Sequence, residues 1–364
     1  MKISAVIDCI ERLAPRSLQE DFDNTGLQTG TSGNECTGVL LCVDPTPEVV
    51  AEAVARGCNL IISHHPLFFK GIKRLTGSTQ VERTAIAAIS AGIAIYSCHT
   101  SVDNTTRGVS WEMARMLGVK VSSTLEPRNA GMIKLSVMVP ESHADDVRIA
   151  LFDAGAGRMG NYDCCSYNTD GTGTFRALQG ADPYVGELLT LHREPEVRID
   201  TVMPAAIRSR VEQALLQVHP YEVPAYEFIS LDNMSSTTGS GIIGSLERPM
   251  SAEELVEHVK TTFGSPVARC SRLPQGYISQ VAMCGGSGGF LIPNAVAAGA
   301  QAMITSDTRY HDFVDYSGQI LLIDIGHYES ERCTKEIFLR TITEIFPNFA
   351  VYYSATEQNP INYL

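Results

Sequence analysis

The stretch NLIISHHP, residues 59–66, sets a short apolar run directly before two adjacent histidines and a proline. An apolar run of this length predicts a buried strand that ends where the polar residues begin. Similar runs at 39–43 and 93–98 alternate with helix-like stretches at 47–56, 81–91 and 110–117. Alternating strands and helices favour parallel strands covered by helices, so the sequence predicts an α/β fold.

The last third of the chain resumes this alternation. The motif Ser251-Ala-Glu-Glu254 predicts a capping box that opens a helix ending near residue 263. Strands are expected at 281–284, 302–305 and 320–324, followed by a long helix over 330–346 and an edge strand at 349–354. Residues 1–15 have the pattern of an amphipathic helix.

The middle of the chain has a different pattern. Strands are predicted at 134–140, 196–203 and 226–229, helices at 145–154 and 205–218, and an extended region at 162–177. This β-α-β pattern, present twice, is typical of a ferredoxin-like α+β module. The segment LDNMSSTTGSG, residues 231–241, is interpreted as a linker. We therefore expect a core domain formed by residues 1–124 and 232–364, interrupted by an insert at 125–231.

Composition limits the classes of partner. The 364-residue chain has a formal net charge of −13, which makes nucleic-acid binding an unlikely function because phosphate backbones require Lys and Arg. No uninterrupted apolar run is long enough for a membrane span, and the charged N-terminus does not fit a signal peptide. The ten cysteines are scattered without a CxxC pair and are interpreted as buried free thiols. These features predict a cytoplasmic protein that does not bind membranes.

Polar residues gather at the ends of four predicted strands, where open α/β sheets bind their ligands. In a helix beginning near His327, the i, i+4 spacing would place His327 and Glu331 on one face. The four clusters are His64 and His65; His99 and Asp103; Asp307 and His311; and Asp324, His327 and Glu331.

These residue types point to metal binding. Imidazole nitrogens and carboxylate oxygens without thiolates suit zinc, manganese, iron, cobalt or nickel, and such ligands commonly build two-metal sites. A single histidine at a strand end is more often structural, but four clusters at one predicted edge favour a metal site. The remaining histidines are interpreted as solvated or packing residues: His143, His192, His219 and His258.

Two glycine motifs have weaker interpretations. Residues 239–244 match GxGxxG, but neither a strand before them nor a helix after them supports a dinucleotide site. Residues 285–289, GGSGG, follow a predicted strand and permit an anion site. Close backbone packing beneath a metal site explains these glycines equally well.

Six motifs together resemble one family, the GTP cyclohydrolase I type 2 homologues, also called NGG-one-interacting-factor-three-like proteins. The resemblance implies five metal ligands and two divalent metal ions per chain. It also implies a homohexameric toroid and an inserted ferredoxin-like domain. The motifs are FDNTGLQTG (22–30), SHHPLFF (63–69), HTSVDN (99–104), CGGSGG (284–289), TSDTRYHDF (305–313) and DIGHYESE (324–331). The implied ligands are His64, His65, Asp103, His327 and Glu331.

Two functions remain open. The first is a metal-dependent hydrolase of a nucleotide or related heterocycle, in which His99 orients a ligand or relays a proton, and Asp307 and His311 orient other groups or contact substrate. The second is a non-catalytic, metal-loaded hexamer that binds a regulatory partner or ligand. The ligand set favours the enzyme, because structural zinc sites are usually closed by cysteines.

Overall fold

The computed structural model describes residues 1–129 and 131–364, which form two compact units. One unit comprises Met1–Arg128 and Ser235–Leu364, and the other comprises Asn129–Met234. The described residues form a mixed α/β fold with three sheets, two of them in the first unit. The expectation that residues 125–231 fold as an independent domain stays a prediction.

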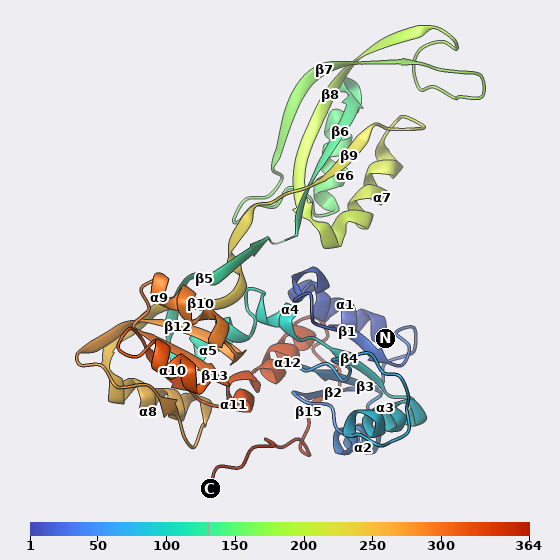
Figure 1. Cartoon of the computed structure of the whole chain (residues 1–364). Helices are drawn as coiled ribbons and strands as arrows, with labels where there is room; N and C mark the ends of the chain where they lie inside the picture. Colours follow the sequence, from blue (N-terminus) through green and yellow to red (C-terminus); the bar gives the residue numbers. More distant parts are fainter. Residues whose placement is uncertain (130) are drawn as a thin grey trace. The chain divides into compact units, whose positions relative to one another are not determined.

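The first sheet has the strand order β1-β4-β3-β2-β15 (Figure 1). Four neighbouring strands of this sheet are parallel: β15, β2, β3 and β4. Strand β1 pairs with β4 in the antiparallel sense. Helices α2 (Pro47–Ala55) and α3 (Gln80–Ala91) pack their apolar side chains onto one face. The strands are β1 (Gly26–Thr29), β2 (Val39–Cys42), β3 (Leu60–Ser63), β4 (Ala94–Ser97) and β15 (Val351–Tyr353).

The second sheet has the strand order β11-β14-β13-β12-β10-β5. Strands β12, β13 and β14 are parallel, whereas β10 and β11 pair in the antiparallel sense. Helix α9 (Ile292–Ala297) packs on one face. The strands are β5 (Val119–Asn129), β10 (Met234–Ser251), β11 (Arg269–Cys270), β12 (Tyr277–Ser287), β13 (Ala302–Ser306) and β14 (Leu321–Asp324).

A shared helical layer joins these two sheets. Helices α1 (Ile3–Leu13), α5 (Val109–Leu117), α8 (Ala252–Phe263) and α12 (Thr334–Ile345) contribute to one core with the inner faces of both sheets. Figure 1 shows α5 and α12 between β2–β4 and β10–β13. Each buried Leu, Ile or Val in this layer stabilises the fold by about 1.5–3 kcal/mol relative to an exposed side chain. The layer therefore joins the two sheets through one shared hydrophobic core.

Several predicted elements are confirmed. The N-terminal helix is α1, and the capping box at Ser251 and Glu254 opens α8. One prediction was wrong, and the bounds of another differ. Most of the expected linker at 231–241 belongs to strand β10, because its Ser and Thr residues find a partner strand. The expected helix over 330–346 is instead the short helix α11 (His327–Glu331) followed by α12.

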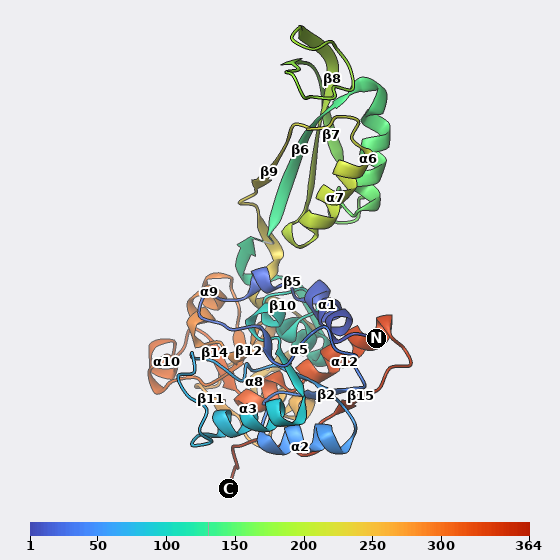
Figure 2. The ribbon, with the colours of Figure 1, turned by 90° about the vertical axis from the view of Figure 1, so that its right-hand side faces the viewer.

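The second unit contains one antiparallel sheet and two helices (Figure 2). Its elements follow the order β-α-β-β-α-β, and its sheet has the strand order β7-β8-β6-β9. Apolar residues of β6, α6, β8 and α7 form a separate core. The elements are β6 (Met132–Pro140), α6 (Ala144–Asp153), β7 (Ser166–Arg176), β8 (Leu191–Pro204), α7 (Arg208–Val218) and β9 (Tyr226–Ser230).

Short helical turns complete the chain. Two of them matter for the site below: α4 (Thr100–Asp103) and η4 (Gly289–Leu291). The others are η1 (Arg16–Leu18), η2 (Glu141–His143), η3 (Ala205–Ile207) and α10 (Tyr310–Asp315). Over the described ranges, 1–129 and 131–364, the search for a helix with the length and hydropathy of a membrane span finds none.

Candidate metal centre

In the first unit, the carboxyl ends of strands from both sheets lead to one cluster of histidines. His64 and His65 follow β3, and His99 follows β4 and precedes α4. His327 and Glu331 lie on α11, directly after β14 of the other sheet. The predicted polar clusters therefore come from two sheets that face each other, not from one sheet edge.

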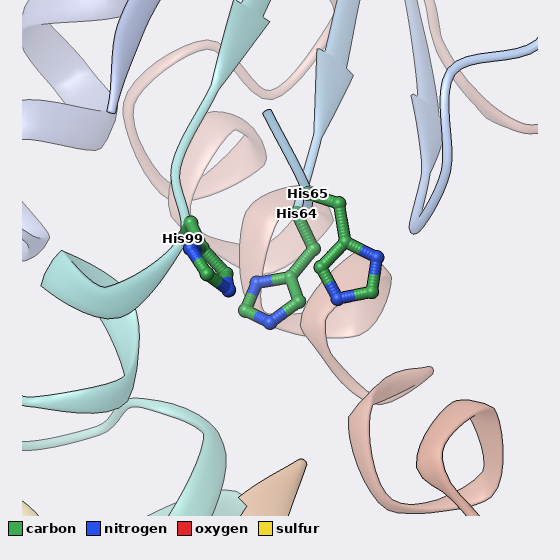
Figure 3. A group of neighbouring side chains, drawn as sticks. All are labelled: His64, His65 and His99. Carbon is green, nitrogen blue, oxygen red and sulfur yellow. The ribbon is translucent and has the colours of Figure 1, made fainter. Parts of the chain in front are cut away.

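The first group of side chains consists of His64, His65 and His99 (Figure 3). One ring nitrogen of each lies within 4.8 Å of the others, so the three could share one ion. Their ring centroids are 5.0 to 5.5 Å apart. His99, expected to relay a proton, is thus also placed as a candidate ligand.

The second group consists of His65, His327 and Glu331. The distance from Glu331 Oε2 is 3.0 Å to His65 Nε2 and 2.9 Å to His327 Nε2. The two imidazole nitrogens are 3.3 Å apart. His65 belongs to both groups, so the two candidate sites lie side by side.

The other nitrogen of each histidine is fixed by an oxygen acceptor. An acceptor at Nδ1 places the ring proton there and leaves Nε2 free to coordinate a metal, an arrangement that orients metal-binding histidines. The Nδ1 contacts are His65 with Asp44 at 2.8 Å, His99 with Asp23 at 2.9 Å, His327 with Asp307 at 2.7 Å, and His64 with the Cys98 carbonyl at 3.2 Å.

Sequence reasoning did not identify Asp23 or Asp44. Asp44 follows the predicted strand at 39–43, so the rule that located His64 and His99 applies to it as well. Asp23 precedes the four-residue strand β1, and only the tertiary fold brings it to His99. Its carboxylate also accepts hydrogen bonds from the Thr100 backbone and hydroxyl.

Two buried polar atoms in the cluster have no hydrogen-bond partner within the described part of the chain: His64 Nε2 and Asp103 Oδ1. They are 3.8 Å apart, and His64 Nε2 is 3.5 Å from Glu331 Oε1. Leaving such atoms unpaired costs about 1–3 kcal/mol each. A divalent cation would satisfy both, so the residues fit a metal site, including the predicted ligand Asp103.

The charges in the cluster also favour the binding of a cation. Burial and the nearby Glu331 carboxylate raise the pKa of Asp103 well above its usual range. Burial opposes the charged form of His65, but its hydrogen bonds to Asp44 and Glu331 outweigh this effect and raise the pKa to about 10. Metal binding would therefore displace protons from these side chains.

A glycine makes room for the Glu331 carboxylate. Gly286, at the end of β12, has a φ of 62°, and a Cβ placed on it would lie 2.1 Å from Glu331 Oε1. The Gly286 amide donates to Ser330 Oγ at 3.0 Å. These contacts favour the close-packing interpretation of the GGSGG motif. The other glycine motif, at 239–244, lies inside strand β10.

Two predicted residues lie elsewhere. His311 is exposed on α10, where its ring lies beside Tyr310, and its predicted catalytic role stays a prediction. Asp324 is buried and accepts hydrogen bonds from Arg269 and from the Thr308 amide. Asp324 therefore stabilises the loop that carries Asp307.

A cavity of about 590 Å³ opens beside the cluster. His99, Asp103, His327 and Glu331 line one side of it. A cavity of this size is typical of sites for small molecules. A bound ligand could thus contact the candidate metal residues directly.

The chain is similar to proteins of one family. Residues 1–360 match the model of the Duf34/NIF3 (NGG1p interacting factor 3) family. A Halalkalibacterium halodurans protein named GTP cyclohydrolase 1 type 2 homolog is 38% identical, over 90% of this chain and 89% of that protein.

Solved structures agree with this match. A Bacillus cereus protein related to NIF3 has a TM-score of 0.88 and 34% identity, covering 100% of this chain and 99% of that chain. A Staphylococcus aureus protein has a TM-score of 0.77 and 30% identity over the same shares. The family resemblance of the sequence is confirmed, and the chain belongs to the Duf34/NIF3 family.

Proposed function

We propose that this protein is a metal-dependent hydrolase that holds two divalent metal ions per chain. The observation that carries the proposal is a pair of buried atoms, His64 Nε2 and Asp103 Oδ1, that have no hydrogen-bond partner among the described residues. They lie inside a cluster whose histidine Nδ1 atoms are held by oxygen acceptors. The proposed ligands are His64, His65, Asp103, His327 and Glu331. Zinc, manganese, iron, cobalt or nickel would suit them.

Bound divalent metals supply Lewis acidity, which polarises a substrate oxygen and makes water more acidic. The chain's own residues position the reactants. His99 borders the cavity, and Asp23 fixes its Nδ1, so its Nε2 can bind a ligand or carry a proton. Asp307 holds the His327 ring in place.

The substrate proposed here is a nucleotide or related heterocycle. The similar proteins bear the name GTP cyclohydrolase 1 type 2 homolog, which makes GTP the first compound to test. The cavity volume of about 590 Å³ is compatible with a ligand of this size. Metals at its wall would attract the substrate's phosphates to a protein with a net charge of −13.

Assembly and location are part of the same proposal. We place the protein in the cytoplasm as a homohexamer with a ferredoxin-like insert. The strand order β7-β8-β6-β9 and the β-α-β-β-α-β sequence of elements support that description of the insert. Exposed apolar side chains on the insert support association with other copies: Leu178, Leu189, Leu191 and Val223.

The test compares metal-replete protein with two variants. Wild type should open the guanine ring of GTP, followed as loss of guanine absorbance, and Glu331→Gln should abolish turnover. Glu344→Gln is the matched control, because Glu344 is an exposed carboxylate paired with Arg107 in the turn before α5. Separately, the double variant His65→Ala, Asp103→Ala should lose most bound metal in elemental analysis.

Full metal content in the double variant would contradict the proposed metal centre. If GTP stays intact with every metal tried, the proposed cyclohydrolase activity is wrong. A metal-loaded protein that binds ligand without turnover would then support the alternative, a non-catalytic assembly.

A further inference from the structure

Three phenylalanines line the cavity beside the metal cluster and are exposed to solvent. Phe22, Phe69 and Phe290 are 68%, 51% and 60% exposed. They come from separate segments: the loop before β1, the loop after the two histidines, and η4. Leaving each ring exposed forgoes about 1.5–3 kcal/mol of burial, and an apolar surface gathered at one cavity marks a binding site.

The aromatic wall reaches the histidine cluster. The Phe69 ring lies against His99, with ring centroids 5.3 Å apart and planes at 77°. His99 is fixed by Asp23, the immediate neighbour of Phe22. A planar ring stacked on these phenylalanines would therefore lie next to the proposed metal ligands.

Besides the proposed metal ligands Asp103 and Glu331, two carboxylates line the same cavity, Glu20 and Glu126. Glu20 is occupied by Arg128 and by Asn104, which donates to Glu20 Oε1 at 3.1 Å. Glu126 on β5 also lines the cavity, and within residues 1–129 and 131–364 no ion pair or side-chain hydrogen bond engages its carboxylate. An ionised carboxylate only accepts hydrogen bonds, so it matches a ligand edge with N–H donors.

We propose that Phe22, Phe69 and Phe290 bind the ring of a planar heteroaromatic ligand, and that Glu126 selects rings with adjacent N–H donors. This inference rests on the proposed function, because it names the part of the substrate that the cavity recognises. A ring with a 2-amino group beside a ring N–H offers two donors to Glu126. The same ring without the amino group offers one.

The test measures binding to the full-length, metal-loaded chain by calorimetry. The probes are GMP, IMP, which lacks the 2-amino group, and ribose 5-phosphate, which lacks the ring. GMP should bind more tightly than ribose 5-phosphate. Each of Phe22→Ala, Phe69→Ala and Phe290→Ala should weaken GMP about fivefold to 150-fold, the range for loss of one stacked base. Ribose 5-phosphate binding should not change.

Tyr277→Ala is the matched control, because Tyr277 is 72% exposed and does not line this cavity. Glu126→Gln should reduce the preference for GMP over IMP by about tenfold or more, the value of a hydrogen bond to a charged group. Circular dichroism of each variant verifies folding, which substitutions of exposed rings should preserve.

Equal binding of GMP and ribose 5-phosphate overturns the proposal, as does wild-type GMP affinity in the phenylalanine variants. If those variants instead change the mass of the assembly at unchanged GMP affinity, the rings form a contact between copies, and the proposal is also wrong. If GMP binding weakens in the phenylalanine variants but wild type shows no turnover, the ring site is supported and the hydrolase proposal is wrong. If wild type turns over GTP but the phenylalanine substitutions leave GMP binding unchanged, the hydrolase proposal is supported and the ring site is wrong.

Discussion

Gly286→Ala tests whether the close approach of β12 shapes the metal centre. The new Cβ would lie 2.1 Å from Glu331 Oε1 and 3.5 Å from His327 Cε1, so the carboxylate must move. Glu331 is buried and contacts His64, His65 and His327, which leaves it little room to do so. We expect metal affinity to fall at least tenfold, about the lower limit for disturbing residues around a metal site.

The matched control is Gly92→Ala. Gly92 has a φ of 67°, close to the 62° of Gly286, but no atom lies within 4 Å of a Cβ placed on it. Both substitutions incur about 1–2 kcal/mol for a left-handed backbone. Only Gly286→Ala disturbs a buried ion pair, whose complete loss costs about 3–5 kcal/mol. Its extra destabilisation should therefore reach up to about 5 kcal/mol.

Two measurements decide the comparison. Urea unfolding in the presence of a chelator gives the free energy of unfolding of each metal-free variant. Competition with a zinc-buffering chelator gives metal affinity. If Gly286→Ala matches Gly92→Ala in both, the proposed role of this glycine is refuted.

Further predictions concern other parts of the chain. Asp307→Asn should weaken metal binding about 10- to 100-fold in the same competition assay without unfolding the protein, because it loosens His327. Burial raises the pKa of Glu52, but hydrogen bonds from Ser354, Ala355 and Thr356 outweigh this and lower it to about 2. Because the pKa of Glu52 is lower in the folded protein than in the unfolded chain, its carboxylate stabilises the fold at pH values above 4.5. This contribution to the free energy of unfolding disappears as the pH falls towards 2. Glu52→Gln should thus cost up to about 3 kcal/mol at pH 7 in urea unfolding and flatten the stability profile between these pH values. Replacing residues 129–234 by a short glycine linker should leave a folded, metal-binding protein, since every proposed ligand lies outside that unit; a soluble product without metal would contradict the domain scheme.

Sequence patterns indicated most residues of the candidate metal centre because strand ends are easy to recognise. Buried apolar runs at β3, β4 and β14 fix where the strands end, and His64, His99 and His327 follow these ends. The i, i+4 spacing correctly indicated that His327 and Glu331 share a helix, α11. The same patterns could not show that the strands belong to two sheets, since this depends on packing between distant segments.

The errors have physical causes. Ser, Thr and Gly at 231–241 favour loops locally, but pairing within the sheet of β10 outweighs that preference. The helix expected over 330–346 is α12 from Thr334 onward, and a turn at residues 332–333 separates it from α11. Periodicity alone does not reveal such a turn. His311 follows a strand end as the other histidines do, yet α10 leaves it exposed.

The parallel pairing of β15 with β2 has a consequence during protein synthesis. Val351–Tyr353 covers the edge of β2, a strand made about three hundred residues earlier. Until then β2 presents unpaired backbone groups, the usual template for unwanted association between chains. His327 and Glu331 also emerge late, so the nascent chain acquires this sheet edge and the residues of the candidate metal centre almost together. A chain stalled before residue 327 would be both unable to complete the centre and prone to aggregate.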